Sequence, residues 1–355
     1  MRRRKTDRKS FRSANRTNPL PENDTRRSTD APRVTALLTV ALVFFLGVSF
    51  FMGPAKLSAA QLLAGLFSSH DAAGVIAREI RLPRALLAAF VGAALGASGA
   101  ALQGLFRNPL AEPGVTGVTS SAGLGAILAL YFGFAAISPV LLPVFAILGA
   151  LAAAGILYLL SRAGAGITAL VLAGVAIASF ATAMTALALS LASNPFAMSE
   201  MVHWMMGSLA NVTLNDVAFT APLVLAGIAL MLTTGRGLDA LILGEEAAHS
   251  LGVDLHAVRR RVILGVALAT GAATSVAGAV SFVGLVVPHL LRRAYGYEPA
   301  RLLLPSALGG AVLVMAADIV IRIVSPDGQL LLGVVTALLG APFFVMLILR
   351  LRSET

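Results

Sequence analysis

The chain has 355 residues, of which 57% are hydrophobic and only 12% are charged, and its mean hydropathy is +0.86. Soluble domains have roughly 25% charged residues, so this chain lacks the polar surface that would face water on all sides. A soluble enzyme and a disordered protein are excluded. Because the chain has no cysteine, a disulfide scaffold and thiolate metal sites are excluded too. The five histidines are scattered, and we expect no metal site and no resident cofactor.

The positive charge gathers at the N-terminus. Residues 1–33 hold 11 Lys and Arg against 4 Asp and Glu, in a chain with a net charge of +10. Such an arm could bind nucleic acid or anionic lipid. Frequent Pro, Ser, Thr and Asn favour a disordered cytoplasmic tail that follows the positive-inside rule. We therefore expect no nucleic-acid partner.

The rest of the chain is a series of apolar stretches, and a helix needs about 20 residues to cross a membrane. The candidate spans are 34–52, 85–106, 114–133, 138–160, 166–191, 215–235, 260–283, 284–296, 303–322 and 330–349. The stretch 262–291 is long for one crossing and short for two. The number of crossings decides on which side Arg292, Arg293, Arg301, Arg350 and Arg352 lie. Ten crossings place all five in the cytoplasm, as the positive-inside rule requires, together with both termini.

The predicted organisation is thus a tail over 1–33, an all-α membrane domain over 34–350 and a short cytoplasmic C-terminus over 351–355. Small residues recur every four positions within the spans, for example Gly92 and Gly96. This spacing places them on one helix face, where backbones can approach closely. Such faces either pack helices tightly or line a wide pathway.

No catalytic constellation is present. The chain has no phosphate-binding GxxxxGK[ST] sequence, so it has no known P-loop route to ATP hydrolysis. Ion pumps usually keep Asp, Glu or His at the membrane midplane. Here Asp318 and Arg322 lie one helical turn apart at the outer end of a span, and Glu112 lies in a cytoplasmic turn. An ATPase-independent secondary transporter is therefore disfavoured.

The segment 238–258 is expected on the cytoplasmic side. It reads as a short amphipathic helix, a glycine turn at Gly252 and a second short helix. A unit of this kind suits either a helix-in-groove contact with a soluble partner or a helix lying on lipid. The acidic residues Glu245, Glu246 and Asp254 argue against an anionic membrane surface, so we favour a partner protein.

Several local motifs together resemble one family. Arg-Leu-Pro-Arg at 81–84 is followed by a small-residue run at 91–103 and by Arg-Asn-Pro-Leu-Ala-Glu-Pro-Gly at 107–114. Further motifs follow in order at 204–207, 243–252, 282–289 and 333–343. The set resembles the FecCD family of ABC importer permeases over nearly all of 34–350, and only the basic tail lies outside it.

The resemblance implies a type II ABC importer permease fold of about ten transmembrane helices in the cell inner (plasma) membrane. It implies a second permease copy, as a homodimer or close heterodimer, with two cytoplasmic ABC ATPase subunits. A periplasmic or lipid-anchored binding protein would deliver the substrate. The leading expectation is import of an iron(III) chelate (siderophore), with cobalamin or haem as the alternatives. A secondary transporter and a non-transporting membrane scaffold are the alternatives of other classes.

The resemblance also implies residue roles. The ATPase-coupling residues would be Leu243, Gly244, Glu245, Glu246, Ala247, Leu251 and Gly252. The residues that dock the binding protein would be Arg81, Arg84 and Arg322, whose guanidinium groups suit carboxylates. The alternative is internal pairing, such as Arg322 with Asp318 or Arg78 with Glu79. Structural turns or pathway positions would be Asn108, Pro109, Pro288, Gly340 and Pro342.

Overall fold

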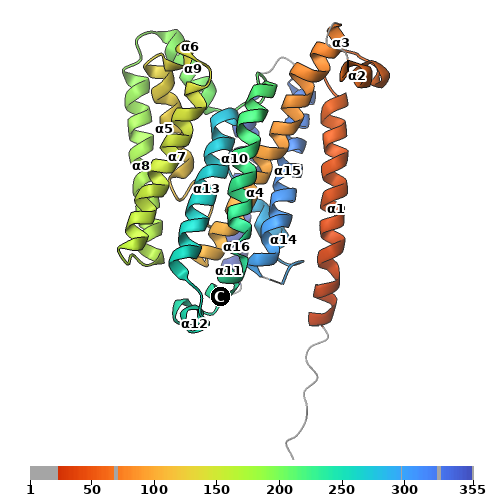
Figure 1. The fold of residues 1–355 in the computed structure, drawn as a ribbon. Coiled ribbons are helices and arrows are strands. Elements are labelled where there is room, and N and C mark those ends of the chain that lie inside the picture. The colour runs from red at the N-terminus through yellow and green to blue at the C-terminus, as the bar shows by residue number, and fades with distance from the viewer. Residues whose placement is uncertain (1–22, 68–70, 297, 326–328, 354–355) are drawn as a thin grey trace, which may run out of the picture.

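The structure is a computed structural model that describes residues 23–67, 71–296, 298–325 and 329–353. Every regular element in these ranges is helical, and the long helices run side by side in one bundle (Figure 1). One end of the bundle carries α9 (Pro195–Met205), and the opposite end carries α12 (Glu245–Ser250). We call these the α9 end and the α12 end.

The helices have the following bounds. Those that form the bundle are α1 (Asn23–Phe51), α4 (Leu82–Phe106), α5 (Val118–Tyr131), α7 (Leu141–Arg162), α8 (Ile167–Ser190), α10 (Leu214–Leu232), α13 (Leu255–Ala277), α14 (Val283–Leu291), α15 (Pro299–Val324) and α16 (Leu332–Ser353). The short ones are α2 (Ala59–Gly65), α3 (Ala72–Val75), the π-helical turn η1 (Ile76–Arg81), α6 (Phe134–Ile137), α9, α11 (Gly235–Ile242) and α12.

Each of the ten predicted stretches coincides with one bundle helix, which confirms an all-helical, polytopic membrane fold. Seven of the described helices are long and apolar enough to cross a membrane by themselves. The other three stretches correspond to shorter apolar helices, namely α5, α14 and the part of α16 over Leu332–Met346. The count of ten crossings therefore stays a prediction.

The ambiguous region 260–296 is divided differently from our prediction. α13 ends at Ala277 rather than at 283, because Gly278 adopts a φ of +67° and turns the chain. Phe282 also has a φ of +67°, which is unusual for a residue with a side chain. α14 then has only nine residues. The turn at Gly278 and Phe282 thus separates one full helix from a half-length one.

Helix α1 begins at Asn23, ahead of the boundary expected at 33. Residues 1–22 of the predicted tail lie outside the described residues. The helix extends this far because, once a helix has formed, each added residue contributes another backbone hydrogen bond. The Tyr295 hydroxyl lies 2.7 Å from Thr35 Oγ1 and donates to the Ala31 carbonyl at 3.2 Å. These bonds fix this part of α1 against the loop between α14 and α15.

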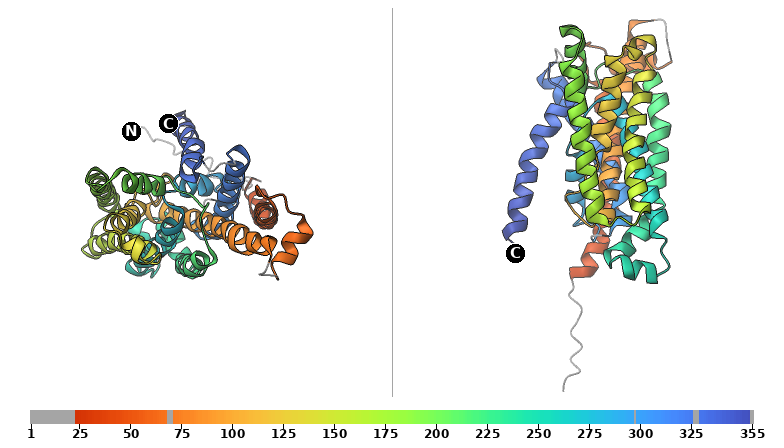
Figure 2. Two further views of the ribbon diagram at one scale, coloured as in Figure 1. Left: turned by 90° about the horizontal axis from the view of Figure 1, so that it is seen from above. Right: turned by 90° about the vertical axis from the view of Figure 1, so that its left-hand side faces the viewer.

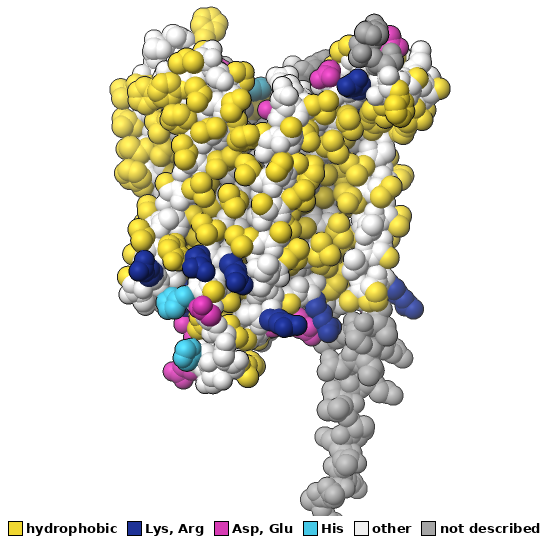
Figure 3. Space-filling view, viewed as in Figure 1, with side chains coloured by type: hydrophobic (Ala, Val, Ile, Leu, Met, Phe, Trp, Pro, Cys, Tyr) yellow, Lys and Arg dark blue, Asp and Glu magenta, His cyan; other side chains and the backbone are white. Residues whose placement is uncertain are grey.

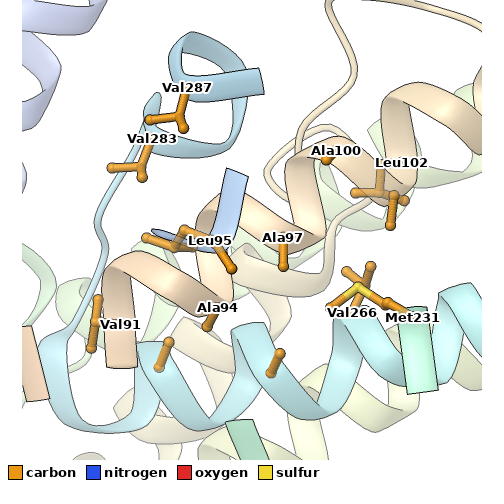
Figure 4. Packing of buried hydrophobic residues seen from close by; sticks show 14 of the residues in the cluster. Val91, Ala94, Leu95, Ala97, Ala100, Leu102, Met231, Val266, Val283 and Val287 are labelled. Atoms are coloured by element: carbon orange, nitrogen blue, oxygen red, sulfur yellow. The ribbon is translucent and has the colours of Figure 1, made fainter. Parts of the chain in front are cut away.

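Helix α4 lies at the centre of the bundle, where it packs against α15, α13, α10 and α14. Figure 4 shows small and branched apolar side chains of α4 facing those of α10, α13 and α14. The glycine face that the sequence predicted is used for packing. A Cβ at Gly92 or Gly96 would collide with the backbone carbonyl of Gly310 or Ser306 of α15. The same face meets α14, where Gly99 abuts Gly284.

The surface has the pattern of a membrane protein. Apolar side chains cover the flank of the bundle, and Lys and Arg side chains gather in a row toward the α12 end (Figure 3). α16 stands away from the rest of the bundle (Figure 2). Its side chains Leu338, Leu339 and Val345 are 66%, 61% and 56% exposed, so α16 offers an uncovered apolar face.

Candidate functional site

At the α12 end, a short helix projects beyond the bundle between two glycines (Figure 1). Gly244 precedes α12 with φ +103° and ψ +160°, a conformation that is essentially restricted to glycine. Gly252 follows α12 with φ +79°. Its N–H donates to the His249 carbonyl at 2.9 Å, and the Val253 N–H donates to the Ala248 carbonyl at 3.1 Å. This pair of bonds is the Schellman motif, in which a left-handed glycine ends a helix.

The predicted turn at Gly252 is therefore confirmed, but the helices around it differ from our prediction. The chain breaks once more at Gly244, so that α11 and α12 are separate helices. After Gly252 the long α13 begins at Leu255 instead of a second short helix. Asp254 starts α13 by accepting a hydrogen bond from the Ala257 N–H at 3.0 Å, which lowers the pKa of this carboxyl group.

The side chains of this segment divide into exposed and buried ones. Leu243 and Leu251 flank α12 and are 68% and 66% exposed. Ala248 is fully buried and holds α12 against the bundle. Glu245 Oε1 lies 2.7 Å from Nη2 of Arg259, a buried residue of α13. The segment thus presents apolar side chains outward while one ion pair ties it to α13.

At the α9 end, one buried carboxylate joins two arginines. Asp318 is 1% exposed, and its Oδ1 lies 2.8 Å from Arg84 Nη2. Arg84 Nε donates to Oδ1 at 3.0 Å and to Oδ2 at 3.2 Å, so the guanidinium meets both carboxylate oxygens in fork-like geometry. The other oxygen, Oδ2, lies 2.8 Å from Arg322 Nη2, one helical turn away on α15. The three side chains link α4 to α15.

The arginines also satisfy the C-terminal carbonyls of α1. Arg81 is 4% exposed, and it donates to the carbonyl of Phe51, the last residue of α1, and to that of Ala55 in the following loop, each at 2.7 Å. Arg322 Nη1 donates to the Ser49 carbonyl at 2.8 Å. The last carbonyls of a helix have no partner within that helix, so these two arginines act as its cap.

All three arginines that we expected to dock a partner thus have partners within the chain. The internal pair of Arg322 with Asp318, our alternative, is present, and Arg84 shares the same carboxylate. An ion pair between Arg78 and Glu79 is absent from the described part of the chain. A cavity of about 260 Å³ opens beside Arg84, Asp318 and Arg322. Docking at this cavity stays a prediction.

A second cavity at the α9 end measures about 550 Å³. Glu200, His203 and Trp204 of α9 line it, together with Asn211 and Gly278. Across the described ranges, no three His, Asp or Glu side chains lie close enough to hold a metal ion.

The residues expected at turns or along a pathway lie around α14. The Asn108 side chain accepts a hydrogen bond from the Leu110 N–H at 2.9 Å and so forms a tight turn that includes Pro109. Pro288 lies inside α14, and Pro342 lies inside α16. Gly340 of α16 leaves the space that the Phe282 side chain occupies. These contacts connect α16 to the turn before α14.

Two polar groups, Gln103 and Glu112, hold α14, and sequence reasoning did not assign this role to either of them. Gln103 of α4 donates through Nε2 to the Gly284 carbonyl at 3.3 Å and accepts from Arg292 Nη2 at 2.5 Å. Glu112 accepts a hydrogen bond from the Phe282 N–H, and burial raises the pKa of its carboxyl group. Gln103 is the one polar amide in a run of small and apolar residues, which is the signal that could have revealed it.

Comparison with known proteins agrees with this architecture. Residues 39–350 match the FecCD transport family. The chain is 38% identical to the hemin transport system permease protein HmuU of Yersinia pestis over 333 residues, 91% of this chain and 98% of that protein. It is 44% identical to the vitamin B12 import system permease protein BtuC of Vibrio cholerae over 274 residues, 77% of this chain and 82% of that protein.

A solved structure is similar as well. It is described as an inward-facing conformation of a metal-chelate type ABC transporter, and it superposes with a TM-score of 0.80 at 31% identity. The match covers 90% of this chain and 99% of that one. The chain therefore belongs to the FecCD transport family and is a permease subunit of an ABC importer.

Proposed function

We propose that this permease carries an iron(III) chelate of the siderophore class across the cell inner membrane. Two ATPase subunits dock at the α12 end, and a binding protein delivers the cargo at the α9 end. Both termini lie in the cytoplasm. The row of basic side chains toward the α12 end (Figure 3) supports this orientation, because Lys and Arg are in excess on the cytoplasmic side of membrane proteins.

The proposed ATPase contact rests on the exposure of Leu243 and Leu251, which lie on a segment that projects beyond the bundle. Two exposed leucines beside a short helix suit an apolar groove on a soluble partner. Glu245 and Glu246 in the first turn make an anionic membrane surface a poor alternative. The ATPase is the soluble partner that an ABC permease needs.

The contact is tested with Leu243→Ser/Leu251→Ser in the assembled importer. We expect the variant to insert normally but to lose co-purification with the ATPase, together with stimulated ATP hydrolysis. Leu191→Ser is the matched control, because Leu191 is 59% exposed just after α8, toward the α9 end. Full ATPase binding by the double variant would refute docking at α12.

The cargo is tested by uptake into proteoliposomes that contain the permease, its ATPase and its binding protein. Three labelled cargos are compared: a ferric siderophore, haem and cobalamin. The likeness to a metal-chelate transporter supports the first, and the relatives named for hemin and vitamin B12 keep the other two as alternatives. ATP-dependent uptake of haem or cobalamin alone would replace the siderophore. Uptake without ATP would favour a secondary transporter, and no uptake of any cargo would favour a scaffold.

Docking of the binding protein is proposed at the cavity beside Arg84 and Arg322. Arg84 and Arg322 share the single carboxylate of Asp318, and the charge of Arg81 acts on Arg322, so this cluster holds an excess of positive charge that suits an acidic side chain. The Arg84 side chain is 18% exposed and the more accessible of the two ion-paired arginines. Arg81 is buried, donates its hydrogen bonds to backbone carbonyls and adds a further positive charge to the cluster.

The docking test is Arg84→Gln, with the exposed Lys56→Gln as the control at the same end. The permease is titrated with loaded binding protein over a salt series. We expect weaker binding of Arg84→Gln, and a smaller difference at high salt, where charges are screened. Equal affinity of both variants at low salt would contradict docking at Arg84.

A second permease copy is proposed to cover α16, which stands apart from the bundle with an uncovered apolar face. The copy number of the permease in nanodiscs, measured by its mass, tests this pairing. A single copy in a transport-competent complex would refute it.

A further inference from the structure

Helix α12 is joined to the rest of the molecule by a glycine at each end. Gly244 and Gly252 have positive φ angles of 103° and 79°. A Cβ at Gly252 would meet nothing within 4 Å, and one at Gly244 would meet only the Arg107 guanidinium at 4.0 Å. Glycine has the widest range of backbone conformations. Because the chain is uncrowded at both glycines, it can pivot on either side of α12.

Besides the buried Ala248 and the hydrogen bond from the Val253 N–H to the Ala248 carbonyl, one side-chain ion pair opposes this freedom. Glu245 is the first residue of α12, and its Oε1 lies 2.7 Å from Arg259 Nη2 in the second turn of α13. The Arg259 side chain is 8% exposed, and Glu245 is its only ion-pair partner among the described residues. A buried guanidinium that loses its carboxylate is left as an uncompensated charge. The pair therefore stays together when α12 moves.

Arg259 belongs to a helix that contacts much of the bundle. α13 packs against α10, α7 and α4, and α4 in turn packs against α15. The covalent link from α12 to α13 contains Gly252, so it does not by itself fix the angle between the two helices. The ion pair adds a second link that restricts this angle, because it joins the start of α12 to α13 on the far side of the pivot.

We propose that the Glu245–Arg259 ion pair transmits displacement of α12 to α13, so that Arg259 is a positioning residue for ATP-driven transport. This inference rests on the proposed docking of the ATPase at α12. It predicts that the pair sets how much cargo moves for each ATP hydrolysed, rather than whether the ATPase binds.

The first experiment measures cargo transported per ATP hydrolysed in the reconstituted importer with Glu245→Gln. We expect the complex to assemble and hydrolyse ATP, while cargo per ATP falls about tenfold, within the range typical of coupling between two sites. Glu298→Gln is the matched control. It breaks an ion pair of the same 2.7 Å length with Arg301, but this pair is exposed and does not involve α12. The control should retain the ratio of the native protein.

The second experiment exchanges the two charges in Glu245→Arg/Arg259→Glu. If the ion pair itself matters, the exchange restores most of the cargo-to-ATP ratio that either single reversal loses. Arg260→Gln is the control for position 259, since Arg260 is the exposed neighbour on α13. Failure of the exchange to restore coupling, with the complex assembled, would overturn the proposal.

A spectroscopic measurement separates transmission from simple stability. The chain has no cysteine, so Ser250→Cys and Arg260→Cys can be spin-labelled without background. With the ion pair intact, we expect one narrow distance distribution both with and without a nucleotide analogue. In Glu245→Gln the distribution should broaden. A distribution as narrow as that of the native pair would overturn the proposal.

The outcomes distinguish the two proposals. Normal coupling by an assembled Glu245→Gln complex overturns transmission and leaves docking at α12 intact. Loss of ATPase binding by Glu245→Gln would make Glu245 a docking residue and would also overturn transmission. Absence of ATPase binding by the native chain would refute the proposed docking itself.

Discussion

Replacement of Asp318 by asparagine should destabilise the α9 end more than any other single charge removal. Asp318→Asn keeps the shape of the side chain but leaves Arg84 and Arg322, each 2.8 Å from the lost carboxylate, without their counter-ion. Breaking a buried ion pair in this way costs about 3–5 kcal/mol. The value should lie in the upper part of this range, because one carboxylate serves two cations.

The assay is thermal unfolding of the purified permease in detergent. At ~2 °C per kcal/mol for a large chain, the upper part of this range corresponds to a fall in the midpoint of about 8–10 °C. Glu79→Gln is the control, because Glu79 is an exposed acid at the same end and its loss should lie within about 0.5 kcal/mol. Addition of Arg84→Gln to Asp318→Asn should recover part of the loss by removing one unpaired cation. A midpoint for Asp318→Asn equal to that of Glu79→Gln would refute the reasoning.

Three further outcomes follow from single positions. Gly252→Asn should couple ATP hydrolysis to transport nearly normally, whereas Gly252→Val should not. The reason is that asparagine tolerates a left-handed φ and a β-branched side chain does not. Stimulation of the ATPase by the two variants is the measurement that distinguishes them. Gln103→Leu should destabilise the protein by about 1–3 kcal/mol in the same unfolding assay, since the Gly284 carbonyl of α14 loses the hydrogen bond that the buried Gln103 amide donates to it. Gly96→Val should abolish folded, monodisperse protein on gel filtration, because its side chain would collide with the α15 backbone, and Gly123→Val, where a Cβ meets nothing within 4 Å, should not.

The sequence predicted the helical segments well, because apolar runs and flanking charges are local signals. It failed where one residue redirects the chain. Phe282 takes a left-handed φ although nothing in its residue type favours this. The division of 260–296 into α13 and a nine-residue α14 depends on that turn. Asn23 begins α1 within a stretch whose composition resembles a disordered tail.

For the candidate sites, the sequence predicted which segments matter but not how their charges pair. Asp318 and Arg322 are four residues apart in a helix, so their contact could be expected. Arg84 reaches the same carboxylate across 234 positions of sequence, which only the packing of α4 on α15 brings about. Arg259 is the first of three consecutive arginines, and nothing in the sequence distinguishes it from the other two, whereas the fold buries it against Glu245.

The glycine contacts of α4 constrain how this protein can change over evolutionary time. An ion pair such as Glu245 with Arg259 can be rebuilt by exchanging its two members. At Gly92 and Gly96 the opposing group is a backbone carbonyl, which every amino acid carries. No substitution on α15 makes room for a larger residue there, so only a shift of the whole helix would. Single substitutions at Gly92 and Gly96 are therefore excluded, whereas apolar residues that face lipid can be replaced by other apolar residues.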